Sequence, residues 1–200
     1  MIDITDLQRD AITEAINISM GKAASTFNAM IQEHISLSVP KINFVSSEEA
    51  LDILKLPHEK EVCYIMQKFS GSFFTSDAML VFAQDESLEL VKLFLGEDTP
   101  VEEMTTLERE AMSEIGNIIL NACIGSLSNI LKDRIAGTLP TFRKCKAHTL
   151  FINEKEEEVL LLIFIDFGIE SKAIKGYIVL ILELDSFIKF KEQLLKSLME

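Results

Sequence analysis

The spacing of apolar residues changes along the chain and predicts its elements. Apolar residues recur three and four positions apart over about residues 5–33 and again over 105–132, which is the period of an amphipathic helix. Thr105 or Thr106 is the expected start of the second helix. Each of these long helices opens one half of the chain.

Strands are predicted where β-branched and aromatic residues gather between polar or glycine turns. These segments lie near residues 36–46, 61–69 and 73–83, and then near 136–151, 158–167 and 173–184. A shorter helix follows the last strand of each half, and Asp85 and Asp185 are its expected N-caps because an Asp side chain accepts from free backbone N–H groups.

The chain repeats itself at an interval of one hundred residues, with no insertion or deletion. Residues 76–85 align with 176–185 at this offset. Four polar or proline residues also recur: Asp10, Glu14, Asn17 and Pro40, then Glu110, Glu114, Asn117 and Pro140. Such self-similarity indicates a duplicated α-β-β-β-α unit.

The two repeats, about residues 1–100 and 101–200, are expected to form one domain over 1–200. The polar loops at 55–60 and 153–158 are too short to separate independent domains. We therefore predict an α+β fold with pseudo-twofold symmetry. Its largely antiparallel sheet is expected to carry four helices on one or both faces.

The composition of the chain argues against some classes of binding partner. A net charge of −13 argues against nucleic acid, whose phosphates require clustered Lys and Arg. The longest apolar runs, such as 159–165, fall far short of the roughly 20 residues that span a bilayer. Residues 1–6 lack the basic and apolar regions of a secretory signal, so a cytoplasmic location without membrane contact is expected.

The three cysteines, Cys63, Cys123 and Cys145, have no CxxC spacing and are expected to be buried as small hydrophobic residues. The histidines, His34, His58 and His148, are scattered, and neither HExxH nor a glycine-rich phosphate loop occurs. An enzyme with its own nucleophile or metal is therefore poorly supported.

Two polar stripes are the candidates for chemistry. Asp10, Glu14 and Asn17 (the first surface) are spaced to share one face of a helix. Their equivalents are Glu110, Glu114 and Asn117 (the second surface). A charged stripe is usually only a solvated face, but solvation requires polarity and not the same carboxylate and amide in both copies. An Asn inside a helix also costs about half a kcal/mol relative to Ala, so we interpret both stripes as functional.

The spacing carries a family resemblance. Asp10-xxx-Glu14-xx-Asn17, followed after twenty-two residues by Pro40, resembles the signature of the CheC, CheX and FliY phosphatases. The second copy is similar, except that Glu110 stands where the family has Asp or Ser. Ile16 in place of Gly116 is a further difference between the copies, and we expect it to change how closely a partner approaches the first helix. Pro40 and Pro140 are expected to be structural, at a strand entry or edge.

The resemblance implies hydrolysis of the aspartyl phosphate of a CheY-type receiver. The receiver would supply both the acylated carboxylate and Mg²⁺, so no cofactor of the chain's own is expected. Asn17 and Asn117 would orient the attacking water, because an amide both donates and accepts. Glu14 and Glu114 would hold a receiver lysine, and Asp10 and Glu110 would make secondary contacts at the edge of each site.

A non-enzymatic adaptor is the alternative. Such a protein would keep the fold and bind only a receiver, or the deamidase CheD that partners some family members. A FliY-like switch component is less favoured, because the chain has no room for the additional C-terminal flagellar domain. The paired carboxylates and amides favour catalysis over the adaptor.

Overall fold

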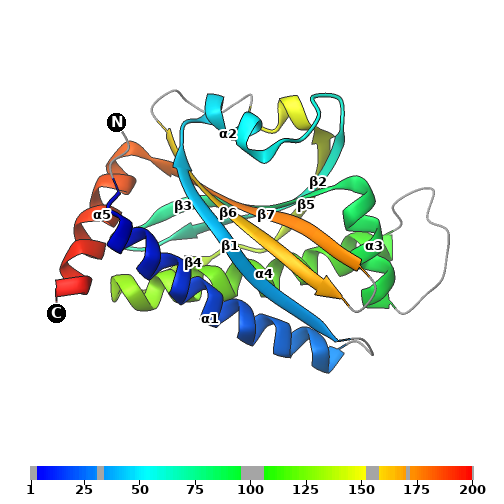
Figure 1. The fold of residues 1–200 in the computed structure, drawn as a ribbon, viewed down its shortest axis with the longest axis horizontal. Coiled ribbons are helices and arrows are strands. Elements are labelled where there is room, and N and C mark those ends of the chain that lie inside the picture. The colour runs from blue at the N-terminus through cyan, green and yellow to red at the C-terminus, as the bar shows by residue number, and fades with distance from the viewer. Residues whose placement is uncertain (1–3, 31–33, 96–105, 152–157, 170–171, 200) are drawn as a thin grey trace.

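The computed structural model describes the chain except for residues 1–3, 31–33, 96–105, 152–157, 170–171 and 200. Each half runs from a long helix through several strands to a shorter helix (Figure 1). In chain order the elements are α1 (Asp6–Met30), β1 (Ile35–Val45), α2 (Ser47–Leu54), β2 (Glu61–Ser70), β3 (Thr75–Ala83), α3 (Gln84–Leu95), α4 (Thr106–Leu131), β4 (Ala136–Gly137), β5 (Thr141–Lys146), the 3-10 turn η1 (Ala147–Thr149), β6 (Glu158–Ile169), β7 (Lys172–Glu183) and α5 (Leu184–Met199).

All seven strands form one antiparallel sheet in the order β1-β6-β7-β3-β2-β4, with β5 also paired to β2. The halves interleave, because the first strand of each half pairs with the second strand of the other half. At the centre, Met79 pairs with Val179, and these residues occupy equivalent positions of the repeat. The axis of pseudo-twofold symmetry therefore passes through this pair, which confirms the predicted α+β fold.

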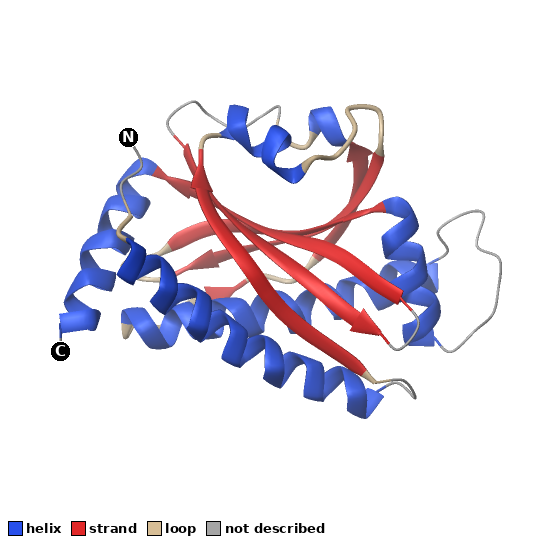
Figure 2. Ribbon diagram, in the orientation of Figure 1, coloured by secondary structure: helices blue, strands red, loops and turns tan. Residues whose placement is uncertain are grey.

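The sheet lies between two layers (Figures 1 and 2). The long helices α1 and α4, with α3 and α5, cover one face, and α2 with η1 covers the other. Along β7, Ile178 and Leu180 belong to the first apolar core, whereas Val179 and Ile181 belong to the second. Because β6 and β7 are buried on both faces, they read as nearly continuous apolar runs.

Some predicted boundaries were wrong. Helices α3 and α5 begin at Gln84 and Leu184, so Asp85 and Asp185 lie inside the first helical turn and are not the N-caps. Their charge still favours the positive end of the helix dipole. The predicted strand 136–151 is divided into β4, β5 and η1. Pro140 lies in the gap between β4 and β5, where its missing N–H costs no ladder bond. Thr106 begins α4, and Thr105 lies outside the described residues.

Helix α2 was missed by the strand-based interpretation of this region. Ser46 caps it, accepting from the Glu49 backbone N–H, while the Glu49 side chain accepts from the Ser46 N–H. This Ser-x-x-Glu capping box is visible in the sequence. The polar loop predicted at 153–158 lies outside the described residues, apart from Glu158 at the start of β6.

Of the two long helices, α4 is more apolar than α1. Its segment Arg109–Leu131 is long and apolar enough, by composition alone, to cross a membrane. In this fold that character has another cause, because Met112, Ile115 and Ile119 are fully buried in the core. Counting only uninterrupted apolar runs overlooked this helix, since polar residues divide it.

Candidate functional site

The first surface lies on the outer side of α1. Asp10 and Glu14 are exposed, and Asn17 is half-buried. The residues Ile12, Ile16 and Met20 turn into the core, so the same helix packs with one face and presents the carboxylates with the other. The helical spacing therefore places these three side chains as the sequence predicted.

Asn17 is hydrogen-bonded to the neighbouring strand through both ends of its carboxamide. Its Nδ2 donates to the Val39 carbonyl at 3.2 Å, and its Oδ1 accepts from the Val39 N–H at 2.7 Å. Pairing of β1 with β6 shifts by one residue between Ser38 and Lys41, so Val39 and Pro40 form a β-bulge on an edge strand. Asn17 satisfies the backbone groups that the bulge leaves unpaired. The sequence spacing between the Asn and the Pro of the motif therefore has a structural reason in the first half.

Two further contacts hold α1 on β1. Arg9 Nη1 donates to the Ile42 carbonyl at 3.0 Å. Asn28 pairs with Ile35 in the same two-bond manner as Asn17 with Val39, at 3.0 and 2.7 Å. Each hydrogen bond of this kind makes a net contribution of about 1 kcal/mol to the stability of the fold. The first surface is therefore carried on a helix fixed along its length.

The second surface has the same exposed carboxylates but a different amide environment. Glu110 and Glu114 on α4 are exposed, and Asn117 is half-buried. Asn117 Oδ1 accepts from Asn121 Nδ2 at 2.8 Å and from Gln67 Nε2 at 3.3 Å. The Nδ2 group of Asn117 forms no hydrogen bond with a described residue. Unlike Asn17, this amide is hydrogen-bonded to no backbone group of a described strand.

Gln67 of β2 is a polar residue of the second site that the sequence interpretation missed. It is only 2% exposed, and its Nε2 also donates to the Thr138 carbonyl at 3.0 Å. Its Oε1 is buried and, within the described part of the chain, has no hydrogen-bond partner. A buried acceptor left unpaired costs about 1–3 kcal/mol. Gln67 is a polar residue at an inward position of a strand whose neighbouring inward positions, Ile65 and Phe69, are apolar, and that was its only signal.

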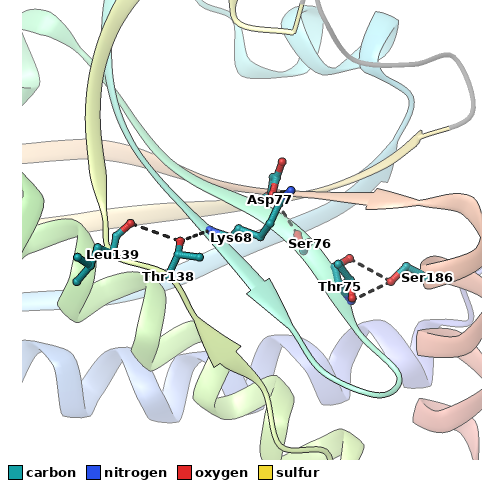
Figure 3. Close-up of polar contacts among 7 residues, drawn as sticks. All are labelled: Lys68, Thr75, Ser76, Asp77, Thr138, Leu139 and Ser186. Carbon is teal, nitrogen blue, oxygen red and sulfur yellow. Dashed lines mark hydrogen bonds and ion pairs between the residues drawn. The ribbon is translucent and has the colours of Figure 1, made fainter.

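Thr138 holds the segment before Pro140 on β2 (Figure 3). Its N–H donates to the Lys68 carbonyl at 2.9 Å, and its Oγ1 accepts from the Lys68 N–H at 3.0 Å. Leu139 is left 87% exposed, whereas its equivalent Val39 is 3% exposed. Pro140 precedes β5 and Pro40 lies at a bulge of an edge strand, as expected for structural prolines.

The expected effect of Ile16 and Gly116 on a partner was wrong. Both residues face inward: Ile16 is fully buried, and a Cβ on Gly116 would lie 2.5 Å from Ile65 Cγ2. Gly116 therefore lets α4 pack closely on β2. Gly21 lies on the exposed side of α1, one turn beyond Asn17, where an added Cβ would meet nothing within 4 Å.

Exposed apolar side chains border the first surface. Leu7 is 70% exposed and Ile18 59% exposed. They lie seven residues before and four after Glu14, so they share its helix face. The equivalent Ile118 is partly buried against the core. Isolated exposed apolar residues are ordinary, but Ile18 lies one turn from Glu14 and Leu7 lies two turns from it on the same face.

The carboxylates of both surfaces form no ion pair within the described part of the chain. None of Asp10, Glu14, Glu110 or Glu114 is paired with a basic group among the residues that the structure describes. Within the same residues, no group of three or more His, Cys, Asp or Glu side chains is arranged to hold a metal. The carboxylates are thus available to a basic partner, while the roles assigned to them stay predictions.

The cysteines offer no activated nucleophile. Cys63 and Cys123 are buried as expected, and Cys145 is half-buried. Burial raises the pKa of all three thiols, that of Cys123 to about 12. Since the thiolate is the reactive form, these residues are inert at neutral pH.

Comparison with known proteins places this geometry in context. The model of the CheC-like family matches residues 7–44, the segment from the first surface to Pro40 and beyond. The flagellar motor switch phosphatase FliY of Bacillus subtilis is 22% identical over 66% of this chain, which spans only 34% of that protein.

Solved structures share the fold. FliY of Thermotoga maritima superposes with a TM-score of 0.76 at 19% identity, covering 97% of this chain and 98% of that one. The FliM middle domain of H. pylori superposes with a TM-score of 0.68 at 10% identity, covering 95% and 99%. The interleaved sheet and paired long helices are therefore a shared architecture.

Proposed function

We propose that this chain, a protein of the CheC-like family, hydrolyses the aspartyl phosphate of a CheY-type response regulator in the cytoplasm. One observation carries the proposal: an exposed carboxylate precedes a half-buried amide by one turn at equivalent places on α1 and α4. The name of the related FliY, a phosphatase, supports the same reaction class.

The proposed reaction needs little chemistry from this chain. A water oxygen attacks phosphorus in line, the bond from phosphorus to the receiver's aspartyl oxygen breaks, and the products are inorganic phosphate and a free carboxylate. The water's proton passes to phosphate or solvent. Positioning and electrostatics dominate such transfers, so an amide on a rigid helix suffices to orient the water. Mg²⁺ would belong to the receiver and would neutralise the phosphoryl charge there.

The other residues would hold the partner. Glu14 and Glu114, unpaired within the described chain, would bind a basic side chain of the receiver, and Asp10 and Glu110 would make secondary contacts. Leu7 and Ile18 would add apolar contact beside Glu14. The charge of −13 would favour encounter with a basic surface. CheD is a second candidate partner, with no surface assigned to it.

A non-enzymatic adaptor is the second candidate function. The contact between Asn17 and Val39 favours it, because a structural task alone would explain an Asn at that place. Asn117 forms no equivalent pair of hydrogen bonds with the backbone of a described strand. The recurrence of the amide where its structural reason is absent supports catalysis.

The test follows the acyl phosphate. A phosphorylated CheY-type receiver with Mg²⁺ is mixed with the protein, and loss of phosphate is timed. We expect faster decay, reduced by Asn17→Ala or Asn117→Ala and nearly abolished by both. Asn129→Ala, an exposed asparagine on α4, is the matched control and should change nothing. Unaltered decay with wild-type protein, despite measurable binding, would establish the adaptor instead.

The carboxylates are tested by affinity. Glu14→Lys and Glu114→Lys should weaken receiver binding, and Glu192→Lys on the exposed side of α5 should not. Normal binding with loss of turnover alone would show that the glutamates do not dock the receiver.

A further inference from the structure

The two surfaces keep the same amide but leave different parts of it available. We propose that Asn121 and Gln67 are positioning residues that restrict Asn117 to donating hydrogen bonds, so that the second surface binds the phosphoryl group while the first surface orients the water. This inference rests on the proposed function and assigns unequal tasks to its two sites.

The first amide retains one group of each kind. A carboxamide has two N–H donors and an oxygen that accepts twice. Asn17 spends one donor and one acceptor position on Val39. One N–H and one lone pair remain, and no other described residue uses them. Asn17 can therefore accept from a water and donate to a neighbouring phosphoryl oxygen at once.

The second amide retains donors alone. Its oxygen accepts from Asn121 at 2.8 Å and from Gln67 at 3.3 Å, which fills both acceptor positions. Both N–H groups of Nδ2 are unused by the described residues. Asn117 can therefore hydrogen-bond an anionic oxygen, but it has no lone pair with which to orient a water.

The cause lies in positions where the repeats differ. At the offset of one hundred residues, Asn121 corresponds to Gly21 and Gln67 to Phe167. Gly21 has no side chain and lies in open space, and the side chain of Phe167 is apolar and fully buried. Neither side chain can therefore donate a hydrogen bond to the first amide. The saturation of the Asn117 oxygen is thus specific to the second half.

Hydrolysis distinguishes the two arrangements. The water oxygen forms the new bond to phosphorus while the bond to the aspartyl oxygen breaks, and the water must direct a lone pair at phosphorus. An amide oxygen that accepts one of the water's protons favours this orientation. An amide that only donates competes for the water's lone pairs. The second surface would therefore contribute affinity for the phosphorylated receiver and a smaller share of the turnover, so Asn17→Ala should slow decay more than Asn117→Ala.

The experiment restores an acceptor on the second surface. Glu14→Lys inactivates the first surface by weakening the docking of the receiver there. It leaves the Asn17–Val39 hydrogen bonds intact. In this background, kcat and KM for dephosphorylation of a phosphorylated CheY-type receiver are compared with and without Asn121→Ala. We expect kcat to rise several-fold with little change in KM, because one lone pair of Asn117 is released. Gln67→Met should act in the same direction, and Asn129→Ala should have no effect.

The possible outcomes distinguish failure of the proposed function from failure of the inference about Asn117. Absence of acceleration by the wild-type protein would remove the proposed function itself. If the wild type is active, an unchanged or lower kcat on adding Asn121→Ala and on adding Gln67→Met would overturn the inference. Full wild-type turnover in Glu14→Lys alone would also overturn it, because the first surface would then not be the source of hydrolysis. Thermal melts confirm that each variant is folded.

Discussion

The first and second surfaces present the same carboxylate and amide, yet different residues inside the protein form hydrogen bonds with the two amides. On α1 the amide is hydrogen-bonded to the backbone of a bulged edge strand, at Val39. On α4 the amide contacts two other side-chain amides, those of Asn121 and Gln67. The outward residues have been retained after duplication, while the inward support has diverged. This separation is expected where an external partner, and not internal packing, fixes the outward residues.

A large difference in stability is expected between alanine variants of the two asparagines. Asn17→Ala should lower the free energy of unfolding by about 1–3 kcal/mol, because the nearly buried Val39 loses partners for its N–H and carbonyl. Asn117→Ala should cost less than about 1 kcal/mol, since it removes contacts between side chains only. Urea unfolding of both variants measures the difference. Equal losses would show that the Asn17–Val39 contact is not a structural support.

Two glycines sharpen the same contrast between packed and open helix faces. Gly116→Ala should destabilise by about 1–3 kcal/mol, because the new Cβ would overlap Ile65 in a closely packed core. Gly21→Ala should stabilise by about 0.5–1 kcal/mol, because its surroundings are open and Ala favours the helix. Guanidinium melts of the two variants should therefore shift in opposite directions. A shared direction would contradict the assigned faces.

The two long helices should also differ in their response to acid. Hydrogen bonds from Asn17, Asn28 and Arg9 hold α1, whereas a carboxylate holds the end of α4: Asp133 Oδ2 accepts from the Phe73 N–H at 2.8 Å. Burial opposes ionisation of Asp133, but hydrogen bonds from the backbone of Phe73 and Ser72 prevail and lower its pKa. Its stabilising effect is therefore complete above the unfolded pKa, about 4, and is lost as the pH falls through the lower folded value.

Asp133→Asn tests this difference. The variant should be less stable than the wild type at pH 7, and its stability should fall less between pH 5 and pH 3, because the titrating carboxyl is gone. Urea unfolding at several pH values provides the measurement. The same slope in both proteins would exclude Asp133 as a source of acid sensitivity.

The last expected change in stability concerns Gln67. Gln67→Met should raise the free energy of unfolding by about 1 kcal/mol, because it removes a buried oxygen without a partner and preserves side-chain volume. The melting temperature should increase accordingly. A clear decrease would show that the hydrogen bonds of Gln67 to Thr138 and Asn117 outweigh the unpaired oxygen.

The fold was predictable because its signals are local and repeated. Helical and strand periods located most elements, and the offset of one hundred residues indicated the pseudo-twofold axis that the Met79–Val179 pair reveals. Interleaving of the halves was not predictable, because strand pairing is a long-range choice that periodicity does not encode. The α2 helix was missed although its capping box was present, since a short helix gives a weak periodic signal.

The candidate site was predictable only from its outward side. Spacing on one helix placed Glu14 with Asn17 and Glu114 with Asn117, because helical geometry is fixed. The contacts that distinguish the amides, to Val39 in one half and to Gln67 in the other, join segments far apart in sequence. They depend on how the helices lie on the sheet, which no local pattern specifies. Ile16 was misassigned for this reason, as its buried direction follows from packing.

Under the proposed function, the two helix surfaces remove phosphate from a receiver. The rate constant for loss of acyl phosphate from a Mg²⁺-loaded, phosphorylated CheY-type receiver tests this, measured with wild-type protein, Asn129→Ala, and the double variant Asn17→Ala/Asn117→Ala. We expect equal acceleration by the first two and a return to the receiver's own rate with the double variant, provided that it remains folded. A folded double variant that accelerates decay as the wild type does would contradict the proposed function.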